Sequence, residues 1–148
     1  MSVARTSAML MSILVGACVT SAMPTVTHGN ETYQLITGER LRSTVMGKIV
    51  TFPSGQAVTG CRSYIFSDDG SSVACGGGGQ DDYGPFVVSN DRVCAVNDGS
   101  LCWQFFRSRT AGYLIRHVAI IPGVTVERVC IEPWMRAVEA CRLPSPTG

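Results

Sequence analysis

The residues of this chain that could do chemistry are two histidines, seven cysteines and a few adjacent acidic pairs. His28 lies in a small, polar stretch, and His117 lies in an apolar one. A nucleophile needs a base within hydrogen-bond distance, and these two histidines offer little of that kind. Asp68-Asp69 and Asp81-Asp82 fall in turns, where solvation explains them better than a glycosidase pair does. The sequence therefore predicts no catalytic residue, and it favours a binding protein over an enzyme.

A ligand site is predicted where cationic side chains meet an apolar strand face. If Thr110-Ala111-Gly112 closes a hairpin, Phe105 lies opposite His117, and the next turn places Arg128 opposite His117 as well. Forked guanidinium donors at the mouth of an apolar cavity suit a carboxylate or phosphate. The competing interpretation is a solvated rim of arginine side chains. The predicted site consists of Arg107, His117, Arg128, Trp103 and Phe105.

An enzyme, such as a periplasmic hydrolase, is the alternative interpretation. An enzyme requires a cleft in which titratable groups converge. Burial of His117 beside an acid and a hydroxyl group would favour this alternative over a binding module.

The first residues indicate export. Residues 1–17 carry Arg5 and then an apolar, acid-free run that is shorter than the about 20 apolar residues of a membrane span. Small residues precede Cys18, as in a bacterial lipobox, so Cys18 is the predicted lipid attachment site. Ordinary cleavage after Ala22 is the rival. Val19 follows the cysteine, which by analogy with enteric sorting favours the outer membrane, on its periplasmic side.

Six cysteines remain once Cys18 is set apart, and an even set in an exported chain predicts disulfides. The spacing of cysteine and histidine suggests no zinc site, and no cofactor is predicted. The connectivity is open, and sequential pairing is the simplest: Cys61–Cys75, Cys94–Cys102 and Cys130–Cys141.

The stretch from Arg92 to Phe106 is the clearest structural signal. Two apolar segments flank Asn97-Asp98-Gly99, a turn sequence, and the resulting hairpin places Cys94 opposite Cys102. For the first pair of cysteines, a tight turn at Asp68-Asp69-Gly70 does not place them opposite each other. Either a bulge intervenes there or the pairing differs.

The remaining pattern predicts one mainly β domain over residues 31–142, after a tether at 18–30 and before a tail at 143–148. Short alternating stretches separated by turn residues suggest an antiparallel meander that forms a small barrel or sandwich. Thr37–Met46 predicts a short N-terminal helix capped by Thr37 and ended by Gly47. Pro133–Cys141 predicts a short C-terminal helix. The expected strands are 48–52, 61–66, 71–75, 83–89, 92–96, 101–106, 113–121 and 124–131.

About half of the chain resembles a known family. The resemblance is carried by Gly47-Lys48, Tyr64-Ile65-Phe66 with Asp69-Gly70, Gly84-Pro85-Phe86-Val87-Val88, Arg92-Val93-Cys94 and Cys102-Trp103. These motifs resemble small exported proteobacterial proteins that share a domain of unknown function, in which tryptophan stands where this chain has Phe86. The resemblance implies a β-rich exported domain and assigns no catalytic residue.

The net charge of the chain limits the kinds of partner that we expect. The formal net charge is +1, and no basic run is present, so nucleic acid is not an expected partner. The sequence predicts a non-catalytic binding or interaction module, held at the membrane by its lipid anchor alone. Its expected partner is an envelope protein or a small anionic ligand.

Overall fold

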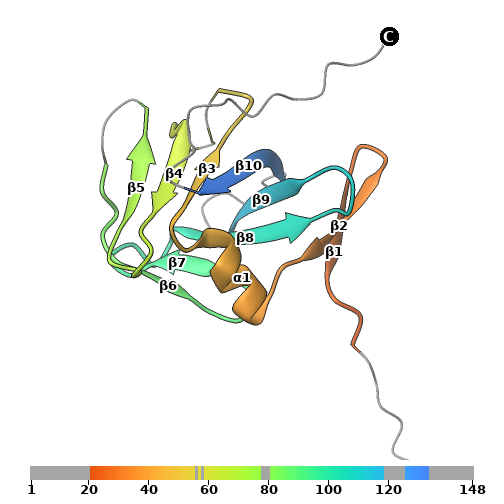
Figure 1. Ribbon diagram of the computed structural model, residues 1–148, viewed down its shortest axis with the longest axis horizontal. Helices are drawn as coiled ribbons and strands as arrows, with labels where there is room; N and C mark the ends of the chain where they lie inside the picture. Colours follow the sequence, from red (N-terminus) through yellow and green to blue (C-terminus); the bar gives the residue numbers. More distant parts are fainter. Residues whose placement is uncertain (1–20, 56, 58, 78–80, 119–125, 134–148) are drawn as a thin grey trace, which may run out of the picture.

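The computed structural model describes residues 21–55, 57, 59–77, 81–118 and 126–133. These residues form one ten-stranded antiparallel sheet and one short helix (Figure 1). The predicted export signal, the predicted lipid attachment site Cys18 and the predicted tail lie outside the described residues. The elements are β1 Thr25–His28, β2 Glu31–Leu35, α1 Gly38–Val45, β3 Lys48–Thr51, β4 Ser63–Phe66, β5 Val73–Gly76, β6 Phe86–Val88, β7 Val93–Ala95, β8 Cys102–Arg107, β9 Tyr113–Val118 and β10 Glu127–Pro133.

The prediction of a mainly β, antiparallel domain is confirmed, and the closed-barrel form is wrong. The strands run in the order β1-β2-β8-β9-β10-β3-β4-β5, and β6 pairs with β7, which pairs with β8. One edge of β8 is shared between β2 and β7, so the ladder branches there. At the other end, the edge of β5 bonds to a loop: the Val73 N–H donates to the Gly84 carbonyl at 2.9 Å. Among the described strands, the sheet therefore stays open.

The sheet curls strongly. Three strands separate β4 from β8, so in a flat sheet these two strands would lie about 19 Å apart. The rings of Tyr64 on β4 and Trp103 on β8 nevertheless have their centroids 4.9 Å apart. One continuous sheet therefore wraps around the core. The largest fully buried side chains include Trp103, Tyr33, Tyr64, Phe66, Phe105 and Phe106.

Helix α1 agrees with the sequence prediction in position. It follows Thr37, and Gly47 has a φ of 65°, a left-handed conformation that suits glycine. Leu41 and Val45 are buried against the core, one turn apart on the same face. The Thr37 side chain makes no capping hydrogen bond, which differs from the expectation. The predicted C-terminal helix lies outside the described residues beyond Pro133, the last residue of β10.

The predicted tether is wrong for Thr25–His28. These residues form β1 and pair with β2 in register Val26 to Tyr33, with Gly29 at a φ of 64° in the turn. Two threonines and a valine in this short run are β-branched, which favours a strand. Pairing with β2 makes them part of the sheet.

The stapled hairpin is confirmed. Cys94 lies opposite Cys102 in the β7–β8 ladder, and the two form a disulfide. Its hydrogen-bonded turn is Asp98–Leu101, where the Leu101 N–H donates to the Asp98 carbonyl at 2.9 Å, instead of a loop of Asn97-Asp98-Gly99 alone.

The first cysteine pair is also a disulfide, between Cys61 and Cys75. In the β4–β5 ladder Tyr64 opposes Cys75, so the bridge joins residues that are not register partners, and their Cα atoms lie 5.3 Å apart. Cys130 is disulfide-bonded as well, while Cys141 lies outside the described residues.

Candidate functional site

The predicted cluster of Arg107, His117 and Arg128 does not form. In the β8–β9 ladder Trp103 pairs with His117, two residues away from the predicted partner Phe105. The cause is a turn that closes one residue earlier: the Ser108 N–H donates to the Gly112 carbonyl at 3.0 Å, so the three-residue loop is 109–111 instead of 110–112. The Ser108 hydroxyl also accepts the backbone N–H groups of the two residues before that glycine.

The three side chains of the predicted cluster lie in three different places. Arg107 is exposed at the end of β8. His117 is 3% exposed and lies about 13 Å along the strand pair from that end. Arg128 pairs with Leu114, which belongs to the smaller apolar cluster on the opposite face of the sheet. Trp103 and Phe105 are fully buried, so they serve the core.

His117 instead belongs to a row of interacting polar side chains in the core, which we call the polar series. The Tyr64 hydroxyl lies 2.9 Å from His117 Nε2, and the Thr59 hydroxyl is hydrogen-bonded to the Tyr64 hydroxyl. On the other side of the ring, His117 Nδ1 lies 3.8 Å from Glu127 Oε2. Burial lowers the pKa of His117 to about 4 and raises the pKa of Tyr64 to about 12. At neutral pH the imidazole and the tyrosine hydroxyl are therefore both uncharged, and one hydrogen bond joins them.

This series has the acid and the hydroxyl that the enzyme interpretation requires, but its hydroxyl is enclosed. Tyr64 is 0% exposed, and the rings of Phe52, Phe66 and Trp103 surround it. Glu127 reaches a small cavity of about 300 Å³, whose lining includes neither Tyr64 nor His117. The hydrogen bonds of the polar series satisfy the Tyr64 hydroxyl and His117 Nε2 within the core, whereas His117 Nδ1 is too far from Glu127 for a hydrogen bond.

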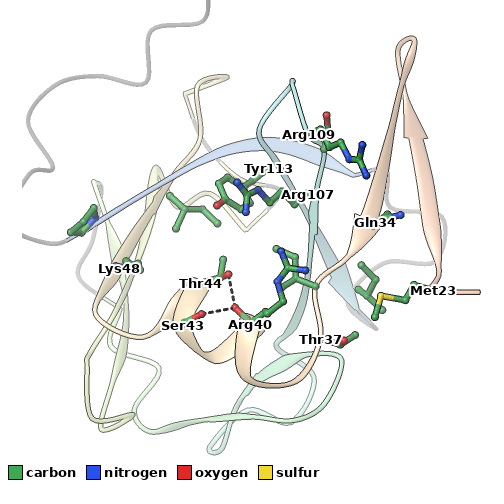
Figure 2. A pocket seen from close by; sticks show the side chains of 15 residues that line it. Met23, Gln34, Thr37, Arg40, Ser43, Thr44, Lys48, Arg107, Arg109 and Tyr113 are labelled. Carbon is green, nitrogen blue, oxygen red and sulfur yellow. Dashed lines mark hydrogen bonds between the residues drawn. The ribbon is translucent and has the colours of Figure 1, made fainter.

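The larger cavity, of about 750 Å³, lies between α1 and the sheet and contains four cationic side chains (Figure 2). We call it the cationic pocket. Its cations come from the helix, from β3, from β8 and from the loop after β8: Arg40, Lys48, Arg107 and Arg109. The other lining residues are Met23, Gln34, Leu35, Ile36, Thr37, Ser43, Thr44, Ser108, Tyr113, Ile131 and Pro133.

Local structure places these cations. Because Leu41 buries its face of α1 in the core, Arg40 is exposed and extends toward the strands that carry Arg107 and Tyr113 (Figure 2). In the sheet, Gln34, Arg107 and Tyr113 lie side by side across β2, β8 and β9. The guanidinium carbon of Arg107 lies 5.7 Å from the centroid of the Tyr113 ring, a cation–π contact that orients the arginine.

The positive charge of the pocket is not neutralised by ion pairs within the described part of the chain. None of the four cations forms one there, and no lining residue is acidic. Glu39 on the same helix faces Arg42 at 3.9 Å. The Glu31 carboxylate accepts hydrogen bonds from the hydroxyl of the lining residue Ser108 and from the neighbouring Thr110 hydroxyl.

Part of the pocket lining is apolar. Leu35 and Ile36 are buried, and Tyr113 and Ile131 are half-buried against the core. An anionic ligand could therefore place its charge at the cationic side chains and an apolar part against Tyr113 and Ile131.

Comparisons of the chain with family models, with curated proteins and with solved structures find no match. In the described part of the chain, no group of three or more histidine, cysteine or acidic side chains could hold a metal ion. The same residues include no helix with the length and apolar character that crossing a membrane requires.

Proposed function

We propose that this chain is an exported, lipid-anchored envelope protein whose β domain binds a small anionic ligand in the cationic pocket. The observation that carries the proposal is the convergence of Arg40, Lys48, Arg107 and Arg109 on one cavity that no acidic side chain lines. The cavity volume of about 750 Å³ is within the range of small-molecule sites. The proposal keeps Arg107 from the predicted ligand site and replaces its other members.

The ligand chemistry follows from the side chains. Arginine binds carboxylate and phosphate groups through paired N–H donors, and Arg40 and Arg107 approach the same space from opposite walls. Tyr113 and Ile131 offer apolar surface beside them. A phosphate or carboxylate attached to a compact apolar group fits this arrangement.

Calorimetric titration of the oxidised chain with inorganic pyrophosphate tests the proposal. Each charge-assisted hydrogen bond contributes about 1.5–3 kcal/mol, so the double variant Arg40→Ala, Arg107→Ala should bind at least 100-fold more weakly, as a rough estimate. Arg107→Ala alone should bind roughly 10-fold more weakly, whereas Arg128→Ala, which removes the same single charge outside the pocket, should bind as the unaltered chain does. Equal losses in these two single variants, with all proteins folded, would refute the pocket.

We also propose lipid attachment at Cys18 and an outer-membrane location facing the periplasm, in line with the resemblance to small exported proteobacterial proteins. The support is the apolar leader and the small residues before Cys18. Mass spectrometry of the mature protein should find a diacylated or triacylated cysteine as its first residue. A free N-terminus at Met23 would refute the lipid anchor and leave export in place.

A hydrolase is the second candidate, because His117 lies between the Tyr64 hydroxyl and the Glu127 carboxylate. In that case Thr59, half-buried at the end of the series, would be the group nearest to solvent. Hydrolysis of para-nitrophenyl acetate by the oxidised chain, lost on His117→Gln and on Thr59→Ala, would support this candidate. A rate equal to that of buffer would remove it for ester substrates.

A further inference from the structure

We infer that the anionic group taken by the cationic pocket is the phosphate of an anionic phospholipid headgroup in the membrane that holds the chain. The inference rests on the proposed function, because it names the ligand class of the same pocket. It makes the pocket a second, headgroup-specific contact with the membrane, in addition to the acyl chains at Cys18.

The length of chain before the pocket is the first argument. Met23 lines the pocket, and Cys18 precedes it by five residues. Five residues span at most about 17 Å when fully extended. A domain of roughly 110 residues has a radius of gyration of about 13 Å, so its far side lies beyond that reach. A lipid anchor at Cys18 therefore holds the pocket side of the domain close to the headgroups.

The distribution of charge is the second argument. The chain as a whole carries a formal net charge of only +1, so attraction to an anionic surface must come from a local cluster. The pocket supplies such a cluster on its rim, where Arg40, Arg107 and Arg109 are all exposed. Exposed guanidinium groups bind phosphate oxygens in pairs, and a phosphate at the membrane surface presents the oxygens that they need.

An apolar side chain at the same rim is the third argument. Met23 is 57% exposed, although it is large and apolar. It lies at the edge of the pocket beside Gln34, where the chain enters the domain (Figure 2). A cationic rim with an exposed apolar residue is the combination by which proteins settle into the interface between headgroups and acyl chains.

Vesicle binding tests the inference. The mature, oxidised chain with Cys18→Ser carries no acyl group, so binding reports the domain alone. It should bind vesicles of phosphatidylglycerol and phosphatidylethanolamine and should not bind vesicles of phosphatidylcholine. Each basic side chain near an anionic surface strengthens binding about fivefold, so Arg40→Ala, Arg107→Ala should weaken it about 25-fold. Arg128→Ala, which lies outside the pocket, should change it less than twofold, as a rough bound.

The outcomes separate this inference from the proposed function. Binding of inorganic pyrophosphate through Arg40 and Arg107 without binding to anionic vesicles overturns the lipid inference and leaves a soluble ligand. Absence of both kinds of binding overturns both proposals. A loss of vesicle binding in Arg128→Ala that reaches the about fivefold expected for any one basic side chain also overturns the inference, because binding then reflects net charge.

Discussion

Burial of His117 should make the stability of this domain depend on pH in the acidic range. The histidine is 3% exposed, and burial lowers its pKa from 6.5 to about 4. In the unfolded chain the imidazole regains its ordinary pKa of about 6.5. Between these two values the unfolded chain binds the proton and the folded chain does not. The free energy of unfolding is therefore unaffected by this group above about pH 6.5, and it falls as the pH drops toward about 4.

The magnitude follows from the size of the pKa shift. One pKa unit corresponds to about 1.4 kcal/mol, so lowering the pKa to about 4 lets His117 remove about 3 kcal/mol of stability by pH 4. The Glu127 carboxylate, 3.8 Å from Nδ1, favours the charged imidazole and acts against this loss. A loss of about 3 kcal/mol is large, because the free energy of unfolding of a typical domain is roughly 5–15 kcal/mol.

Urea denaturation at a series of pH values, with the disulfides intact, measures this effect. His117→Gln is the variant of choice, because glutamine is polar and does not titrate. We expect His117→Gln to be less stable than the unaltered chain at neutral pH and to lose less stability between about pH 6.5 and about pH 4. Carboxyl groups such as Asp91, whose pKa a hydrogen bond from Arg92 lowers, are common to both proteins and cancel in the difference. Equal pH slopes in the two proteins would refute the assignment of a depressed pKa to His117.

Two further predictions concern the backbone and the disulfides. Gly77→Ala should destabilise the domain by about 1 kcal/mol more than Gly55→Ala, as measured by urea denaturation. Both glycines have a positive φ, so alanine is strained at either position. At Gly77 the added Cβ would also lie 2.7 Å from the Arg62 side chain, whereas at Gly55 it would meet no atom within 4 Å. Equal losses would contradict the clash. Replacing Cys94 and Cys102 by alanine should cost about 2.5 kcal/mol, and peptide mapping without reduction should recover that linked pair from the native chain. Free thiols at both positions after export would contradict the fold at this hairpin.

The sequence predicted the individual strands and turns well. Strands are marked by apolar and polar residues that alternate along the chain, and turns by a few residue types, and both signals depend only on residues close in sequence. Cys94 opposite Cys102 is the best example, since a short turn fixes that register. The β8–β9 register was missed by two residues, because the Ser108 hydroxyl holds a loop of residues 109–111, one residue before the predicted Thr110-Ala111-Gly112. The β1 strand was missed because its short β-branched run is stabilised by pairing with β2.

The candidate site was predictable only in part. Arg107 follows the buried residues of β8, so its place at the end of the apolar face could be derived from alternation. Arg40 and Lys48 carry no local signal of a site, because the packing of α1 and the pairing of β3 with β10 bring them to the same cavity. Barrel closure likewise depends on which edges meet across the whole chain, which local patterns do not determine.

The most direct test of the account is an NMR titration of the oxidised chain with inorganic pyrophosphate, in which each backbone amide is observed separately. We predict that the amides which shift fall in two segments, 34–48 and 107–113, because these carry the cations of the pocket. We also predict that the shifts disappear in the Arg40→Ala, Arg107→Ala variant and persist in Arg128→Ala. Shifts confined to the opposite face around Arg128, or none at concentrations that saturate small-molecule sites, would contradict an anion-binding function for this pocket.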